Sequence, residues 1–158
     1  MDYLDKYMDF LIDAYKNPLN IDWEIGSPLV GRFKVMDLEY KIYSDLVING
    51  FMNFKYKKGD QLLNKEGYKI SVIPTVKSGI DFILNDIKPN GIIFVAMDES
   101  KGRKNIYDRY CTTVDSNIWQ VYTKIFENNK IYVIHKKGIS GAIIFETIKY
   151  CTENLIDF

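Results

Sequence analysis

The chain has few residues of the types that build disulfide, metal or membrane structures. Its 158 residues include only two cysteines, one histidine and four prolines. Two cysteines cannot form the disulfide framework of a small secreted domain, and one histidine without a cysteine cluster gives no metal-ligand pattern. No hydrophobic run approaches the roughly 20 residues that a membrane helix needs. The first 13 residues hold four aspartates, whereas a signal peptide begins with basic residues. We therefore expect a cytoplasmic protein without membrane contact.

The charge balance is also neutral, with 21 lysines and arginines against 21 aspartates and glutamates. A protein that binds nucleic acid broadly carries a basic excess, so the composition argues against such a partner. Hydrophobic residues make up 47% of the chain and aromatic residues 15%, which is too much for a disordered chain. The length suits one domain with its own core, which we place over residues 1–158.

The first half of the chain predicts a helix followed by antiparallel strands. Helical spacing of apolar residues covers 1–17 and stops at Asn17-Pro18, because the residue before proline leaves the α region. An irregular segment is expected over residues 19–37, with turn signals at Gly26 and Gly31. Antiparallel strands are expected within 30–73, where apolar and polar residues alternate around 38–42, 52–56 and 68–72. Asn49-Gly50 is a type I′ turn signal that joins the first two strands.

The second half predicts a β-α-β-α core over 75–135 and a strand with a tail over 140–158. Ile73-Pro74-Thr75 is expected to close a strand, and Thr75 is the expected N-cap of a helix that ends before Gly91. The apolar run 92–97 suits a strand covered on both faces. One face of the next helix would be shared by Arg103, Ile106, Tyr107, Tyr110 and Val114. A helix-like stretch around 116–126 and strands over 131–135 and 142–148 complete the order. The predicted fold is α/β (α+β), a mixed sheet with helices on both faces.

This order of elements resembles the GNAT acetyltransferase superfamily, on residues between 68 and 110. A family pattern runs V-x-x-x-N-x-x-A-x-x-L-Y. Here the pattern begins at Val95, Ile106-Tyr107 stands in place of Leu-Tyr, and Ser100 and Arg103 lie near the Asn and Ala positions. The chain is more similar to small GNAT-like proteins of phages and mobile elements. The residues that carry this similarity span 30–135 and are Phe51–Phe54, Thr75-Val76, Ile92–Met97, and Arg103 before Ile106-Tyr107.

The resemblance implies a site for acetyl-CoA, whose pyrophosphate binds a glycine-rich loop before the first core helix. Such a loop works because backbone N–H groups and a helix N-terminus attract the anion. The family motif is Q/R-x-x-G-x-G/A, but the corresponding stretch Ile73–Gly79 has one glycine and no Gln or Arg. We therefore predict a degenerate site. The candidate cofactor-binding residues are Thr75, Val76, Lys77, Ser78, Gly79, Ser100 and Arg103.

Tyr107 is the candidate catalytic residue, because it matches the tyrosine general acid of many GNAT enzymes. A phenol with a pKa of about 10 donates a proton when it is held near the leaving thiolate. The alternative is that Tyr107 only packs against the sheet. No general base is evident, and the candidates by residue type alone are Glu39, Asp98, Glu99 and His135. Cys111 and Cys151 are interpreted as buried, inert thiols rather than nucleophiles.

Three hypotheses of function follow. The first is an accessory protein of a phage or mobile element, in which the fold is a non-catalytic scaffold that binds a host or virion protein. The second is an acetyl-CoA-dependent N-acyltransferase with Tyr107 as its acid. The third is a small-ligand binder that reuses the V-shaped opening between the two central strands. Because function resides in sites rather than in folds, the site geometry must choose among them.

Overall fold

A computed structural model describes residues 18–35, 38–58, 61–62, 72–97 and 101–154. The helix predicted over 1–17 lies outside the described residues, as do Asp98, Glu99 and Ser100. Most of the strand predicted around 68–72 also lies outside them. The described elements form two β-sheets and three α-helices, an α+β arrangement that agrees with the predicted class.

The first sheet has five strands, all antiparallel, in the order β1-β2-β3-β5-β6. The strands are β1 (Asp22–Glu24), β2 (Leu29–Val35), β3 (Leu38–Ser44), β5 (Lys55–Lys58) and β6 (Gln61–Leu62). The antiparallel meander is therefore confirmed. The irregular segment expected over residues 19–37 is wrong, because β1 and β2 lie there. Gly31 is not a turn residue: an added Cβ would lie 2.7 Å from Ile21 Cγ2, so glycine allows close packing within a strand.

The second sheet has four strands in the order β4-β7-β9-β8. They are β4 (Phe51–Asn53), β7 (Gly91–Ala96), β9 (Asn129–Lys136) and β8 (Trp119–Phe126). β4 and β7 are parallel, and the other pairs are antiparallel. The type I′ turn is confirmed, because Asn49 and Gly50 have φ of 59° and 74° and the Phe51 N–H donates to the Ile48 carbonyl at 3.1 Å.

The stretch 51–58 belongs to both sheets. Its first half, β4, pairs with β7, and its second half, β5, pairs with β3. Between them the Phe54 N–H donates to the Ile93 carbonyl at 3.0 Å. Beyond this bond β5 and β7 run in different sheets, so the two central strands diverge.

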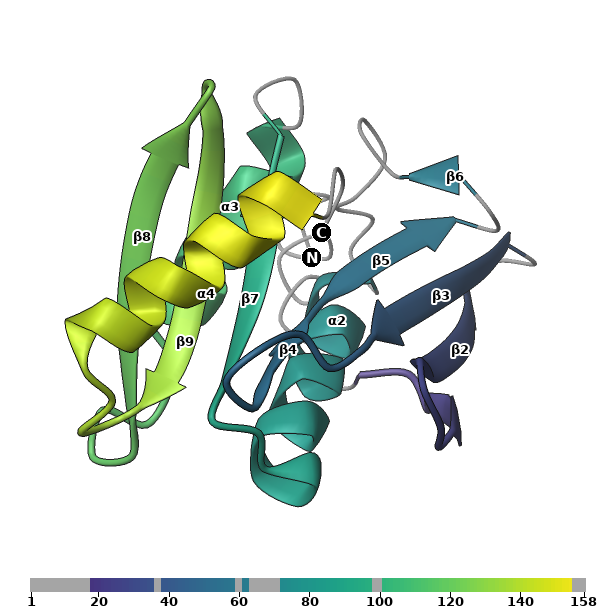
Figure 1. Cartoon of the computed structure of the whole chain (residues 1–158). Helices are drawn as coiled ribbons and strands as arrows, with labels where there is room; N and C mark the ends of the chain where they lie inside the picture. Colours follow the sequence, from purple (N-terminus) through teal and green to yellow (C-terminus); the bar gives the residue numbers. More distant parts are fainter. Residues whose placement is uncertain (1–17, 36–37, 59–60, 63–71, 98–100, 155–158) are drawn as a thin grey trace, which may run out of the picture.

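Helices cover both faces of the four-stranded sheet, as predicted. α2 (Val72–Phe82) continues into one π-helical turn, η1 (Ile83–Ile87), which ends at Lys88 with φ 60°. α2 and α3 (Lys101–Cys111) share one core cluster, and α4 (Gly141–Asn154) covers the opposite face of β7 and β9 (Figure 1). Side chains of β7 alternate between the two clusters, with Ile92 and Phe94 on one side and Ile93 on the other.

Three predicted elements are wrong. Residues 73–75 do not close a strand and Thr75 is not an N-cap, because α2 begins at Val72 and Pro74 is tolerated in a first turn, where its missing N–H has no partner. The helix-like stretch 116–126 contains strand β8, and the strand over 142–148 is helix α4. In α4 the buried residues Ile144, Ile148 and Cys151 have helical spacing, which a short apolar run hides.

Candidate functional site

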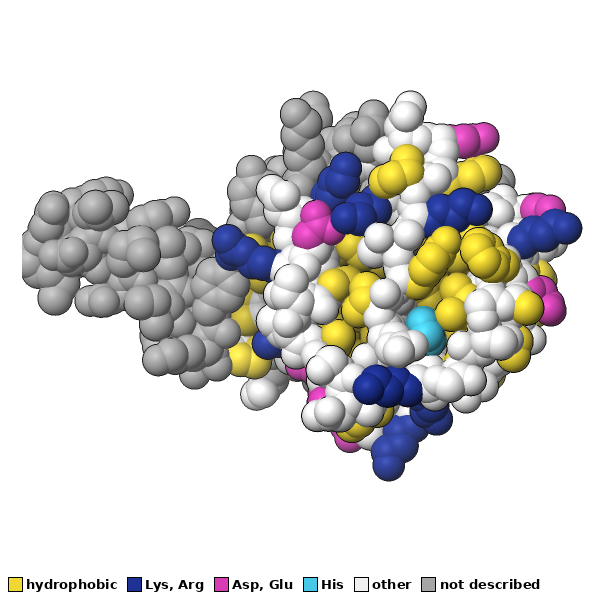
Figure 2. Space-filling view, turned by 90° about the vertical axis from the view of Figure 1, so that its left-hand side faces the viewer, with side chains coloured by type: hydrophobic (Ala, Val, Ile, Leu, Met, Phe, Trp, Pro, Cys, Tyr) yellow, Lys and Arg dark blue, Asp and Glu magenta, His cyan; other side chains and the backbone are white. Residues whose placement is uncertain are grey.

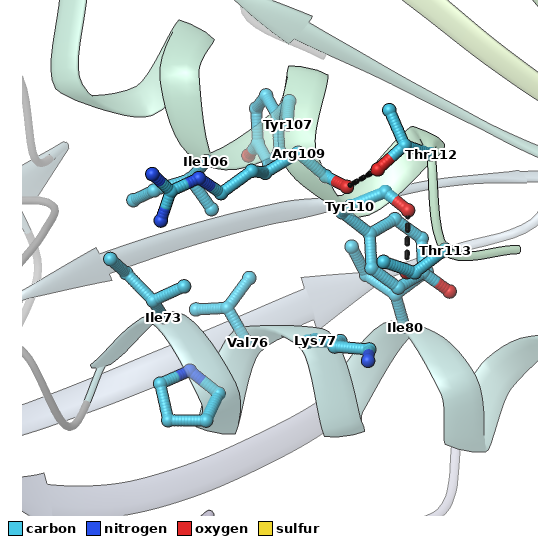
Figure 3. A pocket seen from close by; sticks show the side chains of 11 residues that line it. Ile73, Val76, Lys77, Ile80, Ile106, Tyr107, Arg109, Tyr110, Thr112 and Thr113 are labelled. Carbon is cyan, nitrogen blue, oxygen red and sulfur yellow. Dashed lines mark hydrogen bonds between the residues drawn. The ribbon is translucent and has the colours of Figure 1, made fainter. Parts of the chain in front are cut away.

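A cavity of about 150 Å³ lies between α2 and α3. Side chains from the two helices and the turn after α3 face one another across it (Figure 3). Its lining residues are mostly apolar: Ile73, Pro74, Val76, Lys77, Ile80, Ile106, Tyr107, Arg109, Tyr110, Thr112 and Thr113. The cavity therefore suits a small apolar group, such as an alkyl chain or a ring, rather than a polar one.

Lys77 and Arg109 bring one positive charge from each helix to this cavity. Both residues are exposed, while their apolar neighbours are mostly buried. The hydroxyls of Thr112 and Thr113 donate to the carbonyls of Arg109 and Tyr110, both at 2.7 Å, and so cap α3. Two cationic side chains thus lie beside the apolar cavity, where they would attract a ligand with an anionic end.

Tyr107 lines the cavity but is otherwise enclosed by other rings. Its exposed fraction is 1%. Its ring centroid lies 4.5 Å from that of Phe94, 5.5 Å from Tyr132 and 6.3 Å from Tyr56. Burial raises the pKa of Tyr107 well above its ordinary value, an effect that the charge of Arg103 only partly offsets. The phenol therefore stays protonated at neutral pH, in a position where packing alone already accounts for it.

Arg103 is a buried cation at the start of α3, with 4% of its surface exposed. Its guanidinium carbon lies 4.3 Å from the ring centroid of Tyr56, and its Nη2 donates to the Tyr56 carbonyl at 3.0 Å. Within the described part of the chain, its Nε has no hydrogen-bond partner. Arg103 therefore contacts Tyr56 of β5, the strand that diverges from β7.

Two further tyrosines of this region are fixed by carboxylates. The Tyr132 hydroxyl donates to Asp108 Oδ1 at 2.5 Å, and Lys130 Nζ lies 2.8 Å from the same oxygen. Burial opposes ionisation of Asp108, but these two hydrogen bonds hold its pKa below the ordinary value. The Tyr110 hydroxyl donates to Asp81 at 2.8 Å and so links α3 to α2. Burial, and then Asp81, raises the pKa of Tyr110.

Of the five candidate cofactor-binding residues at 75–79, four are committed to packing or hydrogen bonds within the fold. Thr75 and Val76 are fully buried, and Thr75 Oγ1 accepts the Leu19 N–H at 2.9 Å. Ser78 Oγ donates to the Thr75 carbonyl at 2.8 Å. A Cβ on Gly79 would lie 2.7 Å from Ile42 Cδ1, so this glycine serves close packing of α2 on β3. Among these five residues, only Lys77 is exposed.

The candidate bases and thiols that the structure describes do not line the α2–α3 cavity. Glu39 lies 3.9 Å from Arg32 in the five-stranded sheet. His135 is buried at the end of β9, with Nδ1 2.9 Å from the Lys136 carbonyl. Burial raises the pKa of both thiols to about 12, with a further contribution from Asp108 at Cys111. Such thiols are poor nucleophiles at neutral pH.

Sequence reasoning did not find the aromatic cluster as a unit. The four rings of Tyr56, Phe94, Tyr107 and Tyr132 come from β5, β7, α3 and β9. The sequence indicated burial of Tyr56, Phe94 and Tyr107 one at a time, but not that these rings meet. Nothing in the local sequence of Asp108 marked it as the partner of Tyr132. Among the described residues, no group of three or more potential metal ligands occurs, and no helix has the length and hydrophobicity to span a membrane.

No protein-family model matches the chain, and no curated protein matches it in sequence.

Proposed function

We propose that this chain is a GNAT-like protein of the phage and mobile-element type that serves as an interaction scaffold for a host or virion protein. In this proposal its acyl-CoA site is degenerate and the fold is kept for binding a protein rather than for catalysis. The observation that carries the proposal is the closure of the opening between β5 and β7 by Arg103 and Tyr107.

The strand topology supports the GNAT-like part of the proposal. An antiparallel meander leads into a long strand, 51–58, whose halves join two diverging sheets. After the two-residue strand β6, a helix, a strand parallel to β4 and a second helix follow, in the order that the resemblance implies. The divergence begins at Phe54, inside the segment Phe51–Phe54 that the sequence resemblance singled out.

The side chains at the divergence support the degenerate part. Tyr107 contacts both Phe94 on β7 and Tyr56 on β5, so its ring bridges the two strands. The Arg103 guanidinium lies over the ring of Tyr56, with its carbon 4.3 Å from the ring centroid, and Arg103 is itself buried. A ligand that entered between β5 and β7 would have to displace these rings and the guanidinium, at a cost of several buried contacts.

Binding of acetyl-CoA tests the proposal directly. In isothermal titration calorimetry with the full chain, we expect no saturable binding of acetyl-CoA or free CoA up to millimolar ligand. Micromolar affinity for either compound would contradict the proposal. Gene neighbourhood supplies the second readout: virion structural genes beside this one would indicate a virion partner, and early genes would indicate a host protein.

The α2–α3 cavity favours one alternative, an acetyl-CoA-dependent N-acyltransferase with Tyr107 as general acid. The cavity is lined by Tyr107 and flanked by Lys77 and Arg109, and burial keeps the phenol protonated. Here the apolar cavity would hold part of the acyl donor, and the two cations would attract its phosphates.

Acyl transfer measured in Tyr107→Phe separates the alternative from the scaffold. If the alternative holds, wild type transfers an acetyl group to an amine and Tyr107→Phe loses 10²-fold or more of the rate, on the order expected for a general acid. Tyr110→Phe is the matched control, since Tyr110 lines the same cavity but donates its hydroxyl to Asp81. Equal rates in wild type and Tyr107→Phe would rule out Tyr107 as the acid.

A further inference from the structure

The outer strand β8 leaves one edge of the four-stranded sheet without a partner among the described residues. β8 pairs with β9 on one side only, at the end of the order β4-β7-β9-β8. Six of its eight residues are exposed. Figure 2 views the molecule from the side on which β8 lies, and hydrophobic side chains are visible on that surface. An exposed edge strand is a template for pairing with another strand, because its outer N–H and C=O groups have only water as partner.

The hairpin turn fixes which backbone groups face outward. Glu127 and Asn128 have φ of 51° and 68°, so a two-residue turn joins Phe126 to Asn129, which are opposite one another in the ladder. Such a turn is closed by a hydrogen-bonded pair, and hydrogen-bonded and non-hydrogen-bonded pairs then alternate along the strands. The N–H and C=O groups of Val121, Thr123 and Ile125 therefore point away from β9.

The side chains along this edge are mostly apolar and carry one charge. Val121 is 37% exposed and Ile125 is 59% exposed, and both project from the face that bears Trp119. Lys124 is the one charged residue of β8. On the opposite face, Phe145 of α4 is 54% exposed beside Tyr122, with ring centroids 5.9 Å apart. Edge strands usually carry more charge than this, because charge discourages pairing.

We propose that two copies of this chain form a dimer by antiparallel pairing of their β8 strands about a two-fold axis at Thr123. In this register Val121 of each copy lies opposite Ile125 of the other, and Thr123 lies opposite itself. All three outward-facing residues then enter hydrogen-bonded pairs. The result is one continuous eight-stranded sheet made from both four-stranded sheets.

The same register suits the charge and the aromatic rings on the α4 face. Lys124 of each copy lies opposite Tyr122 of the other, in a non-hydrogen-bonded pair where side chains approach closely. This contact places a cation beside an aromatic ring and keeps the two lysines apart. The exposed Phe145 rings lie on this same face, because a two-fold axis perpendicular to the sheet keeps both α4 helices on one side. The edge is therefore complementary to itself, which favours a second copy over a foreign strand.

Sedimentation velocity and light scattering of the full chain test the dimer. We expect a concentration-dependent species of twice the 18.5 kDa chain mass. Ile125→Lys would place a charge opposite Val121 of the other copy and should shift the dimer to monomer at the same concentration. Ile25→Lys is the matched control, because Ile25 is 68% exposed in the five-stranded part of the molecule, and it should leave the dimer intact.

A disulfide cross-link tests the register. Cα atoms of a hydrogen-bonded pair are about 5.5 Å apart, within the range that a disulfide spans, so Thr123→Cys should give a covalent dimer under mild oxidation. Gln120→Cys should not, because two residues 120 would lie about 20 Å apart along the strands. Wild type under the same oxidant controls for Cys111 and Cys151. A chain that is monomeric at every concentration, a dimer that survives Ile125→Lys, or a dimer that cross-links at 120 instead of 123 would each overturn the proposal.

Discussion

The two faces of the four-stranded sheet are built from different kinds of side chain. On the face covered by α2 and α3, the rings of Phe94, Tyr107 and Tyr132 form a cluster. The ring centroids of Phe94 and Tyr132 are 5.2 Å apart, and the two rings are stacked. Under α4 the core is mainly aliphatic, and its buried members are Phe51, Ile93, Ile131, Val133, Ile144, Ile148 and Cys151. The same strands therefore supply an aromatic face and an aliphatic face.

The two faces therefore differ in whether their buried side chains need hydrogen-bond partners. The aliphatic side chains need only matching volume, whereas the tyrosines of the other face carry hydroxyls that require partners when buried. Those partners are charged: Asp108 for Tyr132 and Asp81 for Tyr110. The α2–α3 cavity lies on this aromatic face. The face whose tyrosines donate hydrogen bonds to aspartates is thus also the face with the candidate site.

Alanine substitutions at two neighbouring residues of β7 test the difference between the two faces, with the largest expected loss of stability. Phe94 and Ile93 are both fully buried but face opposite sides. Phe94→Ala should cost about 3–5 kcal/mol of unfolding free energy by leaving a cavity. Ile93→Ala should cost about 1 kcal/mol less, because it removes no aromatic pair. Urea denaturation followed by circular dichroism measures both, and equal costs would mean that ring geometry adds nothing to burial.

Removal of one hydroxyl from each face gives a smaller effect. Tyr132→Phe removes the hydrogen bond to Asp108 and should cost about 1.5–3 kcal/mol, the range for a bond to a charged group. Tyr122→Phe, on the α4 face, should stay within about 0.5 kcal/mol of wild type, since its hydroxyl has no hydrogen bond to the described residues. The same denaturation experiment compares them. A similar loss in both variants would show that the carboxylate partner is not what distinguishes Tyr132.

Sequence reasoning predicted the elements whose pattern is local. The meander, the Asn49-Gly50 turn, the buried strand at 92–97 and the buried face of α3 follow from periodicity and turn chemistry. The prediction was wrong where a short apolar run is compatible with both a helix and a strand. Residues 119–126 form a strand, and residues 142–148 lie in a helix. Proline also misled, because Pro74 in a first turn begins a helix rather than ending a strand.

The candidate site was predictable only in part, for a physical reason. Tyr107, Arg103 and Lys77 were named from a short motif and from their place in the element order. The contacts that define their surroundings are tertiary: Tyr56 and Phe94 lie in different sheets, and Asp108 meets Tyr132 across 24 positions of sequence. No local pattern encodes a pair of that separation.

The smallest expected effect is the pH dependence that Asp108 gives to the aromatic face. Its folded-state pKa lies below its ordinary value, so its contacts stabilise the fold above about pH 4 and are lost as the pH falls through the folded pKa. Asp108→Asn keeps an acceptor for Tyr132 but loses the charge that faces Lys130. At neutral pH this should cost less than about 1 kcal/mol, because the side chain is 44% exposed and solvent screens the pair.

Urea unfolding of wild type and Asp108→Asn between about pH 7 and about pH 3 measures this contribution. The difference in unfolding free energy between the two proteins should shrink as the pH falls, because protonation makes the wild-type side chain neutral as well. Lys130→Met is the companion variant: it removes the cation, leaves the Tyr132 hydroxyl in place, and should weaken the pH dependence without abolishing it. If the difference stayed constant across this range, Asp108 would act on the aromatic face through its hydrogen bond alone, and charge would not distinguish the two faces of the sheet.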